Sequence, residues 1–374
     1  MNRLANATLL QQYELSIGKT DRFSKDDIAP ILMGLYGEVG SLMATSKKYH
    51  REKKAYIGYK SAVEEEFGDA LWYFCAVCLR LGISIEEMLG ESFRSIESEG
   101  KILKPSKSRL SASRKLDAAL IDLGFTAALL LHDWKNLNRL REHVFTFARL
   151  YFVSLELTRL DFREILEKNL RKTLGRFDAP DPRDLEDFDA AFAEDEQLPR
   201  SFEIEIYQKS SGSTYLRWNG VFIGDPLTDN ISKPDGYRFH DVFHMAHAAV
   251  LHWSPTFRAL IKKKRKSNQK IDMTQDGGRS IVIEEGLTAW LFSRAKELNY
   301  FKDHNSVSFD VLKTIQSFVK GYEVASCPLS LWEDAILQGY AVFRQVKANN
   351  GGIVIGDRGN RRISYRALGE KSES

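Results

Sequence analysis

Two acidic residues, Glu66 and Asp69, stand three positions apart in the segment EEFGDALWYF. If that segment is a helix, the spacing places both carboxylates on one face, about one turn apart. Their neighbours are mostly apolar, and a charge buried among apolar side chains needs a partner, because leaving it unpaired is expensive. A divalent cation is one such partner, and a Lys or Arg from another helix is the alternative.

A third acid, Glu38, lies among apolar residues of an earlier segment, GLYGEVGSLMATSKK. Gly37 and Gly40 flank it, and we expect them to let another helix approach closely. Carboxylates from two neighbouring helices can enclose Mg²⁺, which prefers hard oxygen ligands and bridges to substrate phosphates. Lys47 and Lys48 follow in the same segment and would contact those phosphates as point charges. The pattern therefore predicts a metal-and-phosphate site.

These two segments resemble the MazG family of all-α nucleoside triphosphate pyrophosphohydrolases, over residues 28–98. The family carries an ExxE motif on one helix and an ExxD motif on the next. Glu38 matches the first acid of ExxE, Ser41 stands where the second acid would be, and Glu66 and Asp69 match ExxD. The resemblance implies a helical bundle, usually a homo-oligomer, that binds Mg²⁺, with Mn²⁺ as an alternative ion.

The same resemblance implies cleavage of a nucleoside triphosphate to the monophosphate and pyrophosphate. It assigns metal binding and catalysis to Glu38, Glu66 and Asp69, and it matches Lys47 and Lys48 to a basic pair that binds substrate. Ser41 offers an oxygen but no charge, so we expect weaker metal binding, or one ion fewer, with activity retained.

An internal repeat is indicated in the helical half, because residues 65–89 can be aligned with residues 143–166. In that alignment Val144 falls opposite Glu66 and Phe147 opposite Asp69, so the second copy has lost its acids. The length of the repeat, about 80 residues, suggests two copies of a small helical unit.

The ending of the second copy, EKNLRKTLGRF, is closer to the family ending than residues 90–100 of the first copy are. It supplies Asn169, Lys172 and Arg176, which match the Asn-x-x-Lys segment and the following Arg. We therefore expect a composite site, with metal ligands from the first copy and phosphate- or base-binding residues from the second. The alternative is that the second copy is only scaffold and its polar ending is solvated.

Three histidines, His240, His244 and His247, recur at helical spacing in YRFHDVFHMAHAAVLHW. Glu284 or Glu285 from a later segment could complete a second metal site for Zn²⁺ or a similar ion. The candidate ligands of this site are His240, His244, Glu284 and Glu285. The alternative is a polar helix junction in which His240 and Asp241 pair with an arginine, either Arg238 or Arg279.

The bulk composition predicts a soluble, cytoplasmic protein of several domains. The chain has 374 residues, of which 43% are hydrophobic and 28% charged, with a net charge of +3 and only three cysteines. That charge is too small to indicate nucleic-acid binding, and no apolar run is long enough to span a membrane. Cys75 and Cys78 lie in an apolar segment and are expected to be core residues, and the basic run 261–270 is expected to be a solvated loop.

The expected fold is an N-terminal all-α region, a MazG-like bundle with a tandem duplicated unit, followed by an α+β accessory domain. FEIEIYQ, TYLRWNGVFIG and a hairpin about DRGN are the expected strands. The expected domains are a MazG-like unit with the acidic site, a degenerate second helical unit, an acidic linker and the accessory domain, over residues 1–100, 101–178, 179–200 and 201–374.

The function that these features predict is Mg²⁺-dependent pyrophosphate release from a nucleoside triphosphate. Two alternatives remain open at this point. One is a catalytically weakened nucleotide-binding sensor, and the other is a metal-dependent hydrolase centred on the histidine cluster.

Overall fold

A computed structural model describes residues 9–86, 88–89, 112–177 and 185–369. The chain divides into two compact units, Met1–Asp178 and Ala179–Ser374. The first unit is helical and the second mixes helices with a five-stranded antiparallel sheet, as the sequence predicts. Residues 90–100, where the ending of the first repeat copy was compared, lie outside the described residues.

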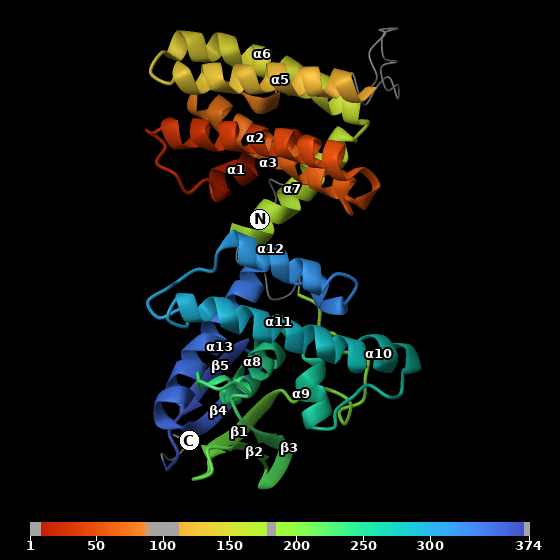
Figure 1. The fold of residues 1–374 in the computed structure, drawn as a ribbon, viewed down its shortest axis with the longest axis vertical. Coiled ribbons are helices and arrows are strands. Elements are labelled where there is room, and N and C mark those ends of the chain that lie inside the picture. Colours follow the sequence, from red (N-terminus) through yellow and green to blue (C-terminus); the bar gives the residue numbers. More distant parts are fainter. Residues whose placement is uncertain (1–8, 87, 90–111, 178–184, 370–374) are drawn as a thin grey trace. The chain divides into compact units, whose positions relative to one another are not determined.

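The described part of the first unit contains two helical hairpins, α2–α3 and α5–α6, together with α1 and α7 (Figure 1). α2 packs against α3 and α5, α5 pairs with α6, and α7 packs against α1 and α3. The described helices are α1 (Leu9–Thr20), α2 (Ala29–Glu52), α3 (Tyr59–Arg80), α5 (Ala112–His132), α6 (Leu137–Thr158) and α7 (Phe162–Phe177), with a short 3-10 turn, Lys53–Ala55, after α2.

The two predicted helical copies share one core. The aligned segments are α3 and α6, and these helices pack on each other: Phe74 stacks on Phe147 with ring centroids 4.8 Å apart. The Tyr151 hydroxyl donates a hydrogen bond of 2.9 Å to the Phe67 carbonyl. Val144 and Phe147, which replace the acids, are fully buried. These apolar side chains contribute to a joint core, which stabilises the helix pair in proportion to the area buried.

Cys75 and Cys78 are buried core residues, as expected. Burial raises the pKa of the Cys78 thiol to about 12, so this thiol stays protonated at neutral pH.

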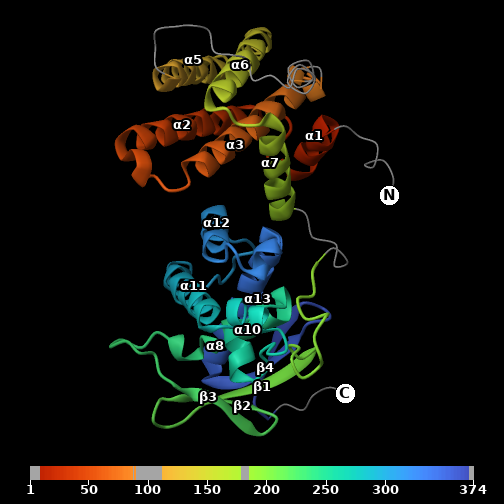
Figure 2. The ribbon, with the colours of Figure 1, turned by 90° about the vertical axis from the view of Figure 1, so that its right-hand side faces the viewer.

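The second unit is built on a sheet with the strand order β3-β2-β1-β4-β5. Helices lie over one face of it, and α8 and α13 contact β4 and β5 (Figure 2). The hairpin predicted about DRGN is present as β4 and β5. TYLRWNGVFIG forms two strands and not one, because Asn219 and Gly220 both have positive φ and form the turn of a hairpin. The strands are β1 (Ser201–Gln208), β2 (Thr214–Trp218), β3 (Val221–Leu227), β4 (Gly351–Asp357) and β5 (Arg362–Arg366).

The helices of the second unit follow β3 and precede β4 along the chain. α8 continues directly into a π-helical turn, a feature that is frequent at functional sites. The helices are α8 (Asp241–Ala246), the π-turn His247–Leu251, α9 (Pro255–Leu260), α10 (Gln269–Thr274), α11 (Gly278–Glu297), α12 (Phe309–Phe318) and α13 (Leu329–Asn349), with 3-10 turns at Tyr237–Phe239 and Glu323–Ser326.

Two polar stretches that the sequence suggested were solvated contribute buried ion pairs instead. In the predicted acidic linker, Asp189 is 1% exposed and accepts a hydrogen bond from Arg258, so residues 185–200 pack on the second unit. In the basic run, Arg265 is also 1% exposed and donates to Asp276 and Glu323. Because removing one partner of a buried ion pair is costly, these arginines are structural. The neighbouring Lys262 and Lys266 are exposed, as expected of a loop.

No described helix is long and apolar enough to cross a membrane.

The buried His252 makes the stability of the second unit depend on pH. Its Nε2 lies 2.9 Å from the Arg358 carbonyl oxygen, so that nitrogen carries a proton and donates it. Burial, together with the charges of Arg358 and Arg361, lowers the pKa of His252 from 6.5 to about 4. Between these two pH values the unfolded chain binds a proton that the folded chain rejects, so stability is complete above pH 6.5 and falls toward pH 4.

We expect His252→Asn to reduce this pH dependence. Asn tolerates the left-handed backbone of this residue, whose φ is 57°. In urea titrations followed by tryptophan fluorescence, wild type should lose about 2 kcal/mol more than the variant between pH 7 and pH 4.5. His304→Asn, at an exposed site, is the control and should follow wild type. Parallel curves for wild type and His252→Asn would contradict the prediction.

Candidate functional site

The three predicted acids of the first unit lie together between α2 and α3. One carboxylate oxygen from each of Glu38, Glu66 and Asp69 lies within 4.8 Å of the other two. All three side chains are partly exposed. Three like charges at this separation repel one another, and a cation placed among them relieves the repulsion.

The close approach of α2 and α3 depends on Gly34 and not on the two glycines singled out from the sequence. A Cβ atom on Gly34 would lie 2.1 Å from Cε1 of Tyr73 on α3. Gly37 and Gly40 are exposed, and a Cβ atom on either meets nothing within 4 Å. The expectation for Gly37 and Gly40 was wrong because their spacing beside Glu38 does not say which side of the helix faces α3.

Tyr73 is a site residue that the sequence reasoning missed. Burial raises its pKa above the ordinary value, and the nearby charges of Glu38 and Asp69 raise it further. Tyr73 therefore remains a neutral hydroxyl beside two carboxylates. The pair of Gly34 and a tyrosine on the next helix was the only signal of this arrangement in the sequence.

The second copy reaches the acids through α7. Lys172 Nζ lies 2.7 and 2.6 Å from the two carboxylate oxygens of Asp69, and 2.9 Å from Glu65 Oε1. Asn169 Nδ2 donates to Asp69 Oδ1 at 3.0 Å, and Asn169 Oδ1 accepts from the Tyr13 hydroxyl at 2.7 Å. Two of the three residues proposed for the composite site are therefore in contact with an acid of the first copy.

Gly68 allows this contact between α3 and α7. A Cβ atom on Gly68 would lie 3.0 Å from the Cβ of Asn169, which is tighter than ordinary packing. Glu65 and Tyr13 are further members of the site that the sequence reasoning missed. Charge complementarity between the lysines of α7 and the acids of α3 was the available signal, since Lys168 also pairs with Glu64 at 2.6 Å.

The other predicted residues of this site are less closely associated. Arg176 lies four positions after Lys172 and so on the same side of α7. Ser41 lies one turn after Glu38 on α2, partly exposed. Lys47 and Lys48 are exposed. With a rise of about 1.5 Å per residue, Lys47 lies about 13 Å from Glu38 along the axis of α2, and it points to the opposite side of that helix. Among the described contacts, neither lysine reaches the acids.

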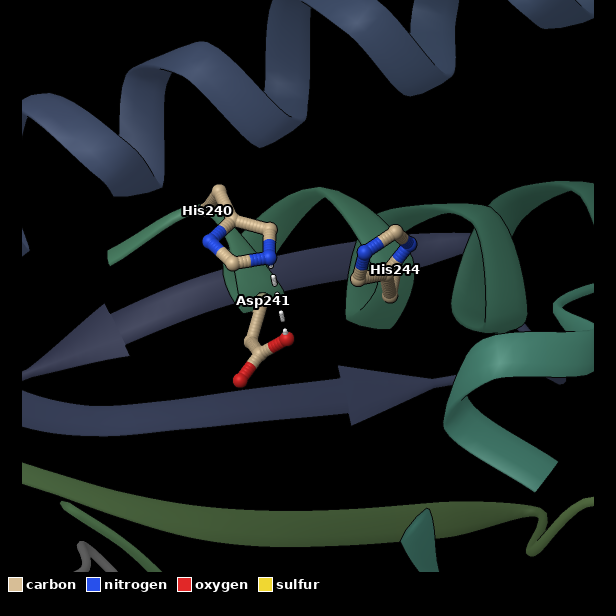
Figure 3. Close-up of side chains that lie close together, drawn as sticks. All are labelled: His240, Asp241 and His244. Atoms are coloured by element: carbon tan, nitrogen blue, oxygen red, sulfur yellow. Dashed lines mark ion pairs between the residues drawn. The ribbon is translucent and has the colours of Figure 1, made fainter. Parts of the chain in front are cut away.

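The second candidate site lies in the C-terminal unit, at the beginning of α8. Figure 3 shows His240, Asp241 and His244 close together there. One ligand atom from each lies within 4.8 Å of the others. Glu285 of α11 faces both histidines: its carboxylate oxygens lie 3.6 Å from His240 Nε2 and 3.3 Å from His244 Nε2. The proposed alternative of pairing with Arg238 is wrong, because Arg238 donates to Asp229, and Arg279 is exposed.

Glu284 is fully buried and belongs to the support of this cluster. Its Oε1 accepts hydrogen bonds from His247 Nδ1 at 2.9 Å and Ser254 Oγ at 2.8 Å, and its Oε2 accepts from the Thr256 backbone N–H at 2.9 Å. Burial alone would raise the pKa of Glu284, but the nearby positive charges of His244 and His247 and the hydrogen bond from His247 outweigh it, and the pKa lies far below the ordinary value. Glu284 is thus an anion that joins α11 to the π-turn and to the beginning of α9.

A family model described as the MazG C-terminal domain matches residues 183–369. The matched region contains the histidine cluster and begins after the helical unit with its acids. No curated protein and no solved structure matches the chain.

We expect Asn169→Ala to destabilise the first unit by about 2 kcal/mol. The substitution leaves the buried Tyr13 hydroxyl without a partner, a loss that costs about 1–3 kcal/mol, and it removes one of the two donors to Asp69 Oδ1, the other being Lys172. Urea unfolding of the full chain measures the change. Arg171→Ala, at an exposed position of the same helix, is the control and should change stability by less than about 0.5 kcal/mol. Equal stability of the two variants would mean that the amide does not hold Asp69.

Proposed function

The chain belongs to the MazG C-terminal domain family, and on that premise we propose that its helical unit is a Mg²⁺-dependent nucleoside triphosphate pyrophosphohydrolase. The observation that carries the proposal is the convergence of Glu38, Glu66 and Asp69, whose oxygens lie within 4.8 Å of one another. The resemblance of these helices to the MazG pyrophosphohydrolases supports the same activity.

The donor set fits Mg²⁺. All three groups are carboxylates, the hard oxygen ligands that Mg²⁺ prefers, and their partial exposure leaves room for waters and phosphate oxygens. When bound, Mg²⁺ neutralises phosphate charge and lowers the pKa of a bound water. Mn²⁺ prefers similar ligands and is expected to substitute.

The acids divide into two roles. Asp69 is held by Asn169 and Lys172, which suits a fixed metal ligand. Glu38 and Glu66 are the two candidates for the general base that takes the proton of the attacking water. Water would attack a phosphorus of the triphosphate chain, with pyrophosphate as the leaving group. Tyr73, kept neutral, would donate a hydrogen bond to a phosphate oxygen.

The second copy contributes from α7. Both ends of the Asn169 amide are engaged by Tyr13 and Asp69, so we assign it to positioning Asp69 and not to reading the substrate. Lys172 brings a positive charge to the acids, and Arg176 extends this basic side of the helix by one turn. We propose that Lys172 and Arg176, and not the distant Lys47 and Lys48, bind the phosphates.

We expect the full chain to release pyrophosphate from one or more members of a panel of ribo- and deoxyribonucleoside triphosphates, only when Mg²⁺ or Mn²⁺ is present. Glu66→Gln and Asp69→Asn should each reduce kcat/KM at least 100-fold, since both remove a metal ligand. Glu64→Gln is the matched control, because Glu64 lies on the same helix but pairs with Lys168. Tight nucleotide binding without pyrophosphate release would support a sensor instead and overturn the enzyme.

The composite site is tested by Lys172→Met, which keeps the length of the side chain and removes its charge. We expect kcat/KM to fall about tenfold, the effect of losing about 1.4 kcal/mol of transition-state binding, with much of the change in KM. Lys168→Met, one turn earlier on α7, is the control. Unchanged KM and kcat would reduce the second copy to a scaffold.

A further inference from the structure

We propose that His240, His244 and Glu285, with Asp241 beside them, bind a divalent transition metal ion in the C-terminal unit, and that Zn²⁺ fits the site best. Two imidazoles with carboxylates are a common donor set for Zn²⁺ and its neighbours, whereas Mg²⁺ and Ca²⁺ bind oxygen ligands. This site differs in donor chemistry from the acidic site of the helical unit and is independent of the pyrophosphohydrolase proposal.

The spacing of the donor atoms fits a tetrahedral ion. Two ligands that each lie about 2.0–2.1 Å from a tetrahedral Zn²⁺ are separated from each other by about 3.4 Å. His244 Nε2 and Glu285 Oε1 are 3.3 Å apart, His240 Nε2 and Glu285 Oε2 are 3.6 Å apart, and His240 Nε2 and Asp241 Oδ1 are 3.7 Å apart. Each of these three pairs is within a few tenths of an ångström of that separation, and one ligand atom from each of His240, Asp241 and His244 lies within 4.8 Å of the others, so the side chains would close in around an ion.

The His240 ring is held in the tautomer that a metal ligand requires. His240 Nδ1 lies 2.9 Å from the Tyr237 carbonyl oxygen, and a carbonyl only accepts, so Nδ1 carries the proton. Nε2 is then left with its lone pair directed to the carboxylates of Asp241 and Glu285. A ligand histidine whose other nitrogen donates to a backbone carbonyl is the usual outer-shell arrangement at metal centres. The Tyr237 ring stacks on the imidazole, with centroids 4.4 Å apart, and fixes its plane.

His244 provides the second, independent sign of a missing ligand. The side chain is fully buried, yet neither ring nitrogen has a hydrogen-bond partner. Its Nδ1 lies 3.1 Å from the buried Glu284 and its Nε2 faces Glu285, so carboxylates are close on both sides without hydrogen-bond geometry. Buried polar atoms are rarely left in this state, because it costs about 1–3 kcal/mol. A metal ion bound to Nε2 supplies the missing partner, with Glu284 as the outer carboxylate on Nδ1.

The two glutamates of α11 have separate roles. Glu284 is buried and accepts hydrogen bonds from His247, Ser254 and Thr256, so we assign it to the support of the ligands and not to direct metal binding. Glu285 has 37% of its side chain exposed, so the site is open to solvent on that side. Metal sites with an accessible side retain a water or bind an outside ligand, whereas purely structural zinc sites are closed.

The experiment is a Zn²⁺ titration of full-length protein that has been stripped with a chelator, in an excess of Mg²⁺ to occupy the acidic site. Wild type should bind one Zn²⁺ per chain, measured by competition with a chromogenic chelator and by elemental analysis. His240→Ala and Glu285→Gln should each weaken Zn²⁺ binding at least about tenfold, because each removes a ligand. Glu285 is partly exposed and His240 is buried, and circular dichroism checks that both variants remain folded.

Two variants serve as controls. His304→Ala, at an exposed position of the same unit, and Glu66→Gln in the acidic site should both bind Zn²⁺ like wild type. Co²⁺ in place of Zn²⁺ should give the visible absorption of a tetrahedral site in wild type, and this absorption should be absent in His240→Ala. Failure of wild type to bind Zn²⁺, equal affinity in wild type and both ligand variants, or loss of binding only in Glu66→Gln would each overturn the proposal.

Discussion

The helical unit depends on one electrostatic constraint: the acids between α2 and α3 need positive charge, and α7 brings some of it. Lys172 reaches both oxygens of Asp69, and Asn169 fixes the same carboxylate from a buried position. Because α7 belongs to the second copy of the repeat, this contact makes the acid-less copy part of the site. Gly68 eases the same contact, since a Cβ atom there would lie 3.0 Å from the Asn169 Cβ and would require the two helices to shift slightly.

The two segments that the predicted repeat aligns have different roles in the structure. Where the first copy has Glu66 and Asp69, the second has Val144 and Phe147, and both of these are fully buried in the joint core. An acid at either position would be costly to bury without a partner. The same helix positions therefore cannot both fill the core and present acids to a metal site.

In the C-terminal unit the corresponding constraint is a buried anion. Glu284 accepts hydrogen bonds from the π-turn, from Ser254 before α9 and from Thr256 at the beginning of α9, and so fixes the π-turn and α9 against α11. The next residue, Glu285, then necessarily lies on a different side of the helix and faces His240 and His244. Successive residues of a helix point about 100° apart. Two adjacent glutamates therefore have different roles, one structural and one facing solvent.

The sequence by itself was sufficient for the fold class and for most chemical groups of both sites, because periodicity, strand alternation and acid spacing are local properties. It identified Glu38, Glu66 and Asp69 as a set, and it indicated that α7 would contribute Asn169 and Lys172. It did not show that Gly34, and not Gly37, meets the next helix, or which of Glu284 and Glu285 faces the histidines. It also did not show that Arg265 is buried, and it missed Tyr73. Each of these depends on which side of a helix or loop meets a neighbour far away in the chain. Only the tertiary packing decides that, since one position of difference along a helix turns a side chain from the core toward solvent.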